Sequence, residues 1–158
     1  MDTRIRKNVE KTIKEKQKES KVLYNPKGTQ YKQEKSIKCI ELTDEYTRID
    51  FLFKSPHYYI NGGWVQINGD SFIRPVGSEA KYKLIQAINI PVTPIKHYFK
   101  RSGEFLSYTL LFPALPKNTR KIDIIEKEAP GTYFNFYAID FSSWMTIPHA
   151  GSQVISNN

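Results

Sequence analysis

The chain has 158 residues, 39% of them hydrophobic and 13% aromatic, and a formal net charge of +8. This length suits one compact domain with tails better than two domains. No run approaches the roughly 18 apolar residues of a membrane span, and a charged stretch follows Met1 where a signal peptide would have an apolar core. We therefore expect a soluble protein that is cytoplasmic as written, or exported or part of a larger polypeptide if the chain has been cut from a longer precursor.

The positive charge is concentrated near the N-terminus. Residues 1–38 carry twelve Lys or Arg and five Asp or Glu, a net of +7, whereas residues 39–158 carry twelve and eleven, a net of +1. The sequence therefore indicates a basic segment attached to a nearly neutral body, and not a basic fold that positions an electrostatic recognition surface.

Residues 1–35 are predicted to form a basic N-terminal arm, either helical or disordered. The stretch from Thr3 to Ser20 contains no Pro or Gly, and three apolar residues fall at helical spacing: Ile5, Val9 and Ile13. So narrow a stripe buries little area, which favours a solvated arm. A helix docking on a partner and contact with nucleic acid or an anionic surface remain open alternatives.

After Ser36 the hydrophobic pattern changes to a period of two. In the run TRIDFLF, Ile49, Phe51 and Phe53 share one face, and similar short runs follow as far as YFNFYAIDF, mostly separated by segments with Gly, Pro, Asn or Ser. Seven to nine such strands without a helical pattern predict an all-β fold, an antiparallel sandwich, over residues 36–141. Residues 142–158 are predicted to form a C-terminal tail.

The run FPALPKNTRKIDIIEK at 112–127 is predicted to be a strand end, a proline-stiffened corner and a new strand. Its segment from Pro113 to Pro116 matches P-x-x-P, but the flanking strands argue against a polyproline ligand. Lys117, Arg120 and Lys121 could hold a phosphate, but no glycine-rich loop leads to a helix N-terminus there. A solvated strand corner is favoured.

The run YTLLFPALPKNTRKIDIIEKE, with ELTDEYTRIDFLF nearer the start, resembles uncharacterised immunoglobulin-like, or telokin-like, β-sandwich domains of Bacteroidota proteins. In those domains a Phe-x-x-Leu-Pro segment, a short loop and an Asp-hydrophobic-Ile-Glu block recur late in the chain. The resemblance covers about residues 36–141. It implies an accessory domain, often attached to other modules, and it implies no particular activity.

Metal and nucleophile signatures are incomplete. His57, His97 and His149 are far apart in the sequence and form no H-x-x-x-H or H-E-x-x-H pair, so no metal site is encoded locally. Cys39 is the only cysteine and falls within an alternating run, where a buried structural thiol is the common outcome, and no G-x-S-x-G elbow occurs. We expect no cofactor, no metal and no catalytic residue.

Two pairs of carboxylates could in principle serve a glycosidase: Asp123 with Glu126, and Glu41 with Asp50. Asp123 and Glu126 are three residues apart, which on a regular strand directs their side chains to opposite faces. This spacing argues against joint acid and base roles for that pair.

The segment SPHYYINGGW at 55–64 holds the candidate partner-binding residues Tyr58, Tyr59 and Trp64. Asn61, Gly62 and Gly63 within this aromatic run indicate a bulge or hairpin turn. Neighbouring residues on a strand point to opposite faces, so at least one tyrosine is expected at the surface, whereas Trp64 is expected in the core. We therefore expect a non-enzymatic accessory or interaction module that binds a protein partner. The alternatives are a carbohydrate-binding module or small hydrolase that uses exposed aromatic and acidic side chains, and, less favoured, nucleic-acid binding through the arm.

Overall fold

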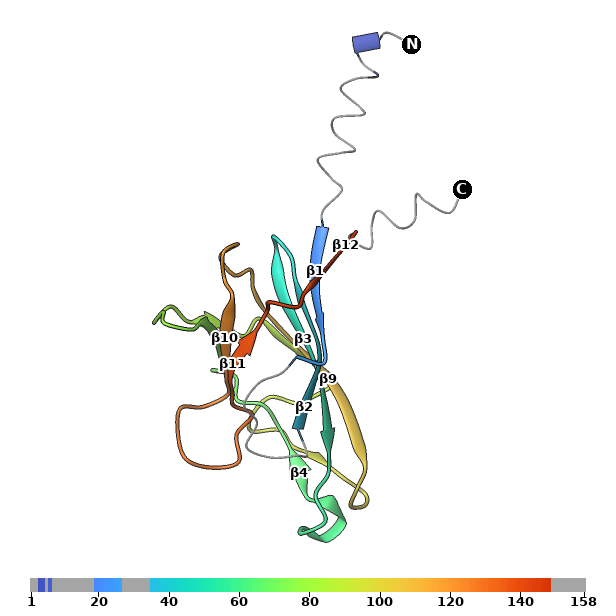
Figure 1. Cartoon of the computed structure of the whole chain (residues 1–158). Helices are drawn as coiled ribbons and strands as arrows, with labels where there is room; N and C mark the ends of the chain where they lie inside the picture. The colour runs from blue at the N-terminus through green and yellow to red at the C-terminus, as the bar shows by residue number, and fades with distance from the viewer. Residues whose placement is uncertain (1–2, 5, 7–18, 27–34, 149–158) are drawn as a thin grey trace.

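The computed structural model describes residues 3–4, 6, 19–26 and 35–148 (Figure 1), and of Glu19 and residues 145–148 only the backbone. These residues form twelve strands and one short 3₁₀ turn. Every pair of named strands is antiparallel. The predicted all-β, antiparallel fold class is confirmed. No helix among the described residues has the length and apolar character needed to cross a membrane.

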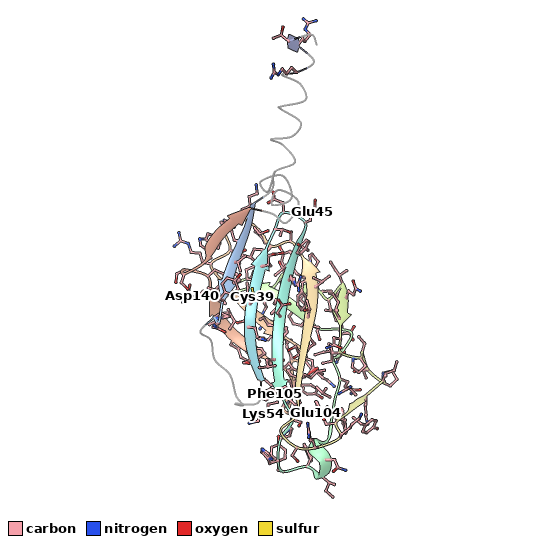
Figure 2. The ribbon with its side chains drawn as sticks, turned by 90° about the vertical axis from the view of Figure 1, so that its right-hand side faces the viewer. Cys39, Glu45, Lys54, Glu104, Phe105 and Asp140 are labelled. Carbon is pink, nitrogen blue, oxygen red and sulfur yellow. The ribbon has the colours of Figure 1, made fainter. Side chains whose placement is uncertain are left out.

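The larger sheet has six strands in the order β12-β1-β2-β3-β9-β7. Figure 2 shows its long strands running side by side. The strands, in chain order, are β1 (Glu19–Tyr24), β2 (Lys35–Leu42), β3 (Tyr46–Lys54), β7 (Gln86–Ile88), β9 (Phe105–Pro113) and β12 (Met145–Pro148).

The second sheet has four strands in the order β11-β10-β5-β6, and a two-stranded ribbon of β4 and β8 completes the fold. These strands are β4 (Trp64–Val65), β5 (Phe72–Pro75), β6 (Tyr82–Lys83), β8 (His97–Tyr98), β10 (Lys121–Ile125) and β11 (Phe136–Asp140), and the 3₁₀ turn η1 spans Ile60–Gly62.

The alternation of β3 shows why these residues form a half-buried strand. Ile49, Phe51 and Phe53 are buried, while the residues between them are partly exposed. Across the interior, the Phe51 ring lies 5.8 Å from the ring of Phe136 on β11 in the other sheet. Removing one such side chain from water stabilises the fold by about 1.5–3 kcal/mol, so contacts of this kind hold the two sheets together.

The sheet extends beyond the range of 36–141 expected from the sequence. Strand β1 lies within the segment predicted as an arm, and its residues Val22 and Leu23 are buried. Strand β12 lies within the predicted tail and pairs with β1, so that Glu19 faces Pro148. The sequence did not indicate β1, because its apolar run is short and the many lysines around it are typical of a solvated segment. Of the expected helix, Thr3, Arg4 and Arg6 are helical, and the rest lies outside the described residues apart from Glu19 and Ser20, which belong to β1.

The strand number also differs from the seven to nine predicted. Several expected strands are divided: the run KYKLIQAINI yields β6 and β7, with Leu84 and Ile85 between them. Strands β4, β6 and β8 have only two residues each. In the run KYKLIQAINI the chain passes from the second sheet to the larger sheet between β6 and β7, and periodicity alone does not reveal such a crossing.

Candidate functional site: an aromatic cleft at one end of the sandwich

A tight turn places the candidate segment 55–64 at one end of the sandwich, near the bottom of Figure 1. Asn61, Gly62 and Gly63 have φ angles of 57°, 82° and 71°. A Cβ on Gly62 would lie 2.7 Å from Ser55 Oγ and 2.8 Å from the carbonyl oxygen of Arg101, so this position needs glycine. The turn brings the two tyrosines that precede it and the tryptophan that follows it to one site, as the sequence expectation of a bulge or turn here implied.

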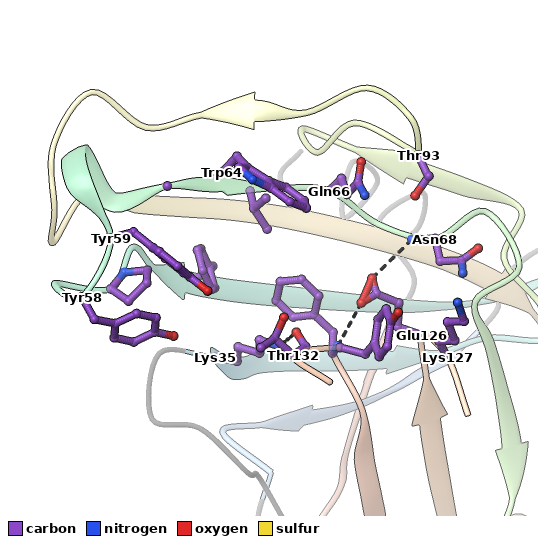
Figure 3. Close-up of a pocket in the computed structure, with 16 residues that line it drawn as sticks. Lys35, Tyr58, Tyr59, Trp64, Gln66, Asn68, Thr93, Glu126, Lys127 and Thr132 are labelled. Carbon is purple, nitrogen blue, oxygen red and sulfur yellow. Dashed lines mark hydrogen bonds between the residues drawn. The ribbon is translucent and has the colours of Figure 1, made fainter. Parts of the chain in front are cut away.

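A cleft of about 350 Å³ lies between this segment and the loop that follows β10. Figure 3 shows Tyr58 and Tyr59 on one side, Trp64 and Gln66 above, and Glu126 at the far end. All three sequence-predicted residues, Tyr58, Tyr59 and Trp64, line the cleft. The volume lies within the range of about 300–1,000 Å³ that small-ligand sites occupy.

The three predicted aromatic side chains are partly exposed: Tyr58 by 61%, Tyr59 by 52% and Trp64 by 46%. The expectation that Trp64 lies in the core is therefore wrong. In the short β4–β8 ladder Trp64 pairs with Tyr98, and Val65 takes the buried side of the strand. Tyr58 and Tyr59, expected on a strand, lie instead in a turn, and both are exposed. The sequence also did not reveal which face of β4 meets the core.

The cleft end opposite the tyrosines carries a buried carboxylate, which sequence reasoning did not assign to a ligand site. Glu126 is only 7% exposed, and its two carboxylate oxygens accept hydrogen bonds from the backbone N–H groups of Asn68 (3.3 Å) and Phe134 (3.1 Å). Burial raises the pKa of Glu126, and these two hydrogen bonds and the charge of Lys35 act in the opposite direction.

Lys35 also lines the cleft, although the sequence placed it in the arm. It is 8% exposed, its Nζ donates to the carbonyl oxygen of Thr132 (2.6 Å), and it lies 4.0 Å from the centroid of the Phe134 ring. The ammonium group thus fixes the loop after β10 against the start of β2. In the sequence, Lys35 and Glu126 are each a charged residue directly beside an apolar run, and this was the only indication of their burial.

The cleft contains further polar atoms. Gln66 Oε1 is buried and has no hydrogen-bond partner within the described residues, and the backbone of Asn68 is already bound to Glu126. An acceptor without a partner costs free energy unless a ligand donor or water reaches it. Aromatic faces with polar groups between them suit a ligand with both apolar and hydrogen-bonding parts.

The metal and nucleophile candidates do not enter this cleft. His57 is exposed and lies near Gly103, and the ring of His97 packs edge-on against Phe99. His149 lies outside the described residues. The described part of the chain holds no cluster of His, Cys, Asp and Glu that could bind a metal ion.

Cys39 is half-buried on β2, and its thiol is free. Burial is the main reason that its pKa is raised, and the charges of Asp50 and Glu41 act in the same direction. A thiol with this surrounding is a weak nucleophile at neutral pH, because little thiolate is present.

Of the two carboxylate pairs considered from the sequence, only Glu126 lines the cleft. Asp123 binds Arg74 Nε (3.2 Å) and the backbone N–H of Ala138 (3.0 Å), away from the cleft that holds Glu126. Glu41 accepts from the hydroxyl of Tyr46, and Asp50 binds Arg48 and Thr109. Each of these three carboxylates takes part in cross-strand contacts of a sheet.

Apolar side chains continue from the cleft onto the surrounding surface. We call this surface the aromatic end, and it consists of Tyr58, Tyr59, Ile60, Trp64 and Tyr98, all of them exposed. Ile60 at the turn is 91% exposed. A cation lies close by, with Lys96 Nζ 4.2 Å from the Trp64 ring centroid.

Comparison with known proteins does not assign a function to this site. No family model, no curated protein and no solved structure matches the chain. The resemblance to immunoglobulin-like domains of Bacteroidota proteins therefore stays a prediction, and the site must be interpreted from its own residues.

Proposed function

We propose that this protein is a non-enzymatic β-sandwich module that binds a partner protein through the aromatic end. The observation that carries the proposal is that Tyr58, Tyr59 and Trp64 line one cleft and yet remain about half exposed. Exposed aromatic side chains of this kind are enriched at protein interfaces, where a buried ring contributes large contact area at low entropic cost.

The extent of the apolar surface favours a protein over a small ligand. Ile60, next to Tyr59, and Tyr98, which pairs with Trp64, are exposed and add apolar area beyond the three residues that line the cleft. Contiguous exposed apolar surface rimmed by polar residues marks interaction sites. A projecting side chain of the partner would enter the cleft, and the partner backbone would cover the rim.

The cleft chemistry supports binding over hydrolysis. Glu126 is the only carboxylate that lines the cleft in the described part of the chain, and both of its oxygens already accept backbone hydrogen bonds. A glycosidase requires two carboxyl groups on opposite sides of the scissile bond. Within the described residues, the site therefore has no second acidic group of the kind that the hydrolase alternative needs.

A carbohydrate ligand is the second candidate, and one observation favours it. Gln66 Oε1 lies buried at the cleft without a partner in the described chain, where a sugar hydroxyl could donate to it. Trp64 and Tyr59 would stack on the apolar face of the sugar ring. This candidate uses the cleft alone, whereas a protein partner also covers Ile60 outside it.

The test is site-specific photo-crosslinking in the native cells. A photoreactive phenylalanine analogue at Ile60 should give a discrete cross-linked protein, and the same group at Ile88, an exposed residue of edge strand β7, should not. Trp64→Ala should weaken the Ile60 cross-link by about tenfold, as expected for an aromatic hot spot. Equal cross-links at both positions, or none at Ile60, would contradict the protein-partner proposal.

The substitution Ile60→Ser distinguishes the carbohydrate candidate from the protein-partner proposal. This substitution removes apolar surface outside the cleft, so it should weaken a protein complex but leave sugar binding unchanged. Binding to a glycan array that Trp64→Ala abolishes and Ile60→Ser does not would support the carbohydrate instead.

A further inference from the structure

Two hollows flank the corner between β9 and β10, at the opposite end of β9 from Phe105. Their volumes are about 590 Å³ and about 550 Å³, and they share Asn118, Thr119, Arg120 and Lys121. The larger hollow is also lined by Lys21 from β1, Lys117 and Asp140. We call Lys21, Lys117, Arg120 and Lys121 the basic corner.

The basic corner gathers four cations around one hollow. Arg48 is paired with Asp50, and Arg74 is paired with both Asp123 and Glu128. Among the residues that the structure describes, no ion pair involves any member of the basic corner. Because the body of the protein is nearly neutral, this local excess is a distinct feature of the surface.

Among the described residues, Asp140 is the one carboxylate that lines the larger hollow, and it is already engaged. Its Oδ1 accepts a hydrogen bond from the backbone N–H of Ser142 (2.8 Å), and Lys121 faces it across the β10–β11 pair. One carboxylate against four cations leaves the hollow strongly positive. A negatively charged ligand would therefore be attracted to it.

Nearly all of the polar side chains around the corner can donate hydrogen bonds. Arg120 and Lys117 are exposed, as is the Asn118 amide, and the hydroxyl of buried Thr119 has no hydrogen-bond partner within the described residues. The Thr119 backbone N–H donates to the carbonyl oxygen of Pro116 (3.0 Å), which holds the corner in its tight form. A guanidinium beside ammonium groups suits the several oxygens of a phosphate.

We propose that the basic corner binds a phosphate-bearing ligand. The sequence favoured a solvated corner because no glycine-rich loop is present, but the converging cations here come from β1 and from the corner itself, which are far apart in the sequence. The ligand is either a small phosphorylated compound or the phosphodiester backbone of a nucleic acid. Residues 1–18, with seven Lys or Arg and three Asp or Glu, directly precede β1, which adds attraction for the polymer.

The test uses the full chain labelled with ¹⁵N and titrated with pyrophosphate at low salt. The backbone amides of Asn118, Thr119 and Ser142 should shift on titration up to about 10 mM, a range that detects even weak binding. The double variant Lys117→Gln/Arg120→Gln should weaken this binding by about tenfold or more, because it removes two charge-assisted contacts. The matched control Lys96→Gln/Lys100→Gln removes the same charge near the aromatic end and should bind as the wild type does.

Three outcomes would overturn the proposal: no shift at the corner, unchanged binding by the corner variant, or equal losses in the corner variant and the control. Equally tight binding of citrate would also overturn it, because the site would then select charge and not phosphate.

A second titration with a short single-stranded oligonucleotide distinguishes the two sources. If the oligonucleotide binds at least about tenfold more tightly than pyrophosphate, the ligand is assigned to a nucleic-acid backbone. This binding should be lost in Lys117→Gln/Arg120→Gln and retained in Lys11→Gln/Lys14→Gln. Pyrophosphate binding without that gain assigns it to a small phosphorylated compound. Oligonucleotide binding lost equally in both variants counts against the corner as the site of the polymer.

Discussion

Glu126→Gln tests the role of the buried carboxylate at the cleft. The substitution keeps the side chain's shape but replaces one acceptor oxygen by an NH₂ group, which can only donate. The two backbone N–H groups of Asn68 and Phe134 then have one acceptor between them. Leaving one such donor unsatisfied in a buried site costs about 1–3 kcal/mol of unfolding free energy.

The difference between wild type and variant should depend on pH. Burial raises the pKa of Glu126 above its ordinary value of 4.5, so the folded protein holds this proton more tightly than the unfolded chain does. The resulting stabilisation is complete below pH 4.5 and is lost as the pH rises through the raised pKa. The variant lacks this titration, so its deficit should be largest at low pH and then shrink, by at most about 1.4 kcal/mol per pH unit.

The measurement is urea unfolding followed by circular dichroism at several pH values from about 4 upward. Glu79→Gln is the control, because Glu79 is exposed and its removal takes away the same charge. A deficit that grows with pH would refute the reasoning. It would show that the hydrogen bonds and Lys35 outweigh burial, and that the folded state favours the carboxylate.

Three further predictions concern packing, the turn and the thiol. Phe51→Ala should lower the unfolding free energy by about 3–5 kcal/mol, whereas Phe105→Ala, at an exposed position, should cost under about 1 kcal/mol; similar losses in denaturant titrations would be inconsistent with the core described. Gly62→Ala should cost about 1–3 kcal/mol more than Gly77→Ala, since both have positive φ but only Gly62 would place its Cβ against backbone; equal melting temperatures would count against this. The alkylation rate of Cys39 by iodoacetamide should still rise above pH 9.0, and a plateau below that pH would show that its pKa is not raised.

The sequence predicted the parts of the fold that follow from simple alternation. Ile49, Phe51 and Phe53 are buried on β3 as expected, and the prolines at 113 and 116 mark the corner between β9 and β10. In each case the local pattern and the tertiary environment agree. The turn at Asn61–Gly63 was also indicated, because glycine and asparagine accept positive φ.

The sequence did not predict which charged residues are buried. Lys35 belongs to a lysine-rich segment and Glu126 to a run that ends in charges, so both resemble solvated positions. Each contacts a residue from a distant part of the chain: Thr132 accepts from Lys35, and the backbone N–H of Asn68 donates to Glu126. Contacts between residues this far apart in sequence leave no local signal. Trp64 shows the same limit, since its exposure depends on its pairing with Tyr98.

The pairing of β1 with β12 determines how the sandwich would respond to tension. Glu19 faces Pro148, and the ladder continues inward to Val22 and Met145, with β12 at the edge of the sheet. A force that pulls the two strands apart at Glu19 and Pro148 would load the ladder's hydrogen bonds one after another, which is the unzipping geometry. Such a ladder separates at lower force than one in which all bonds are sheared together. The edge strand would therefore peel away first, and β2 and β3 would remain paired inside the sheet.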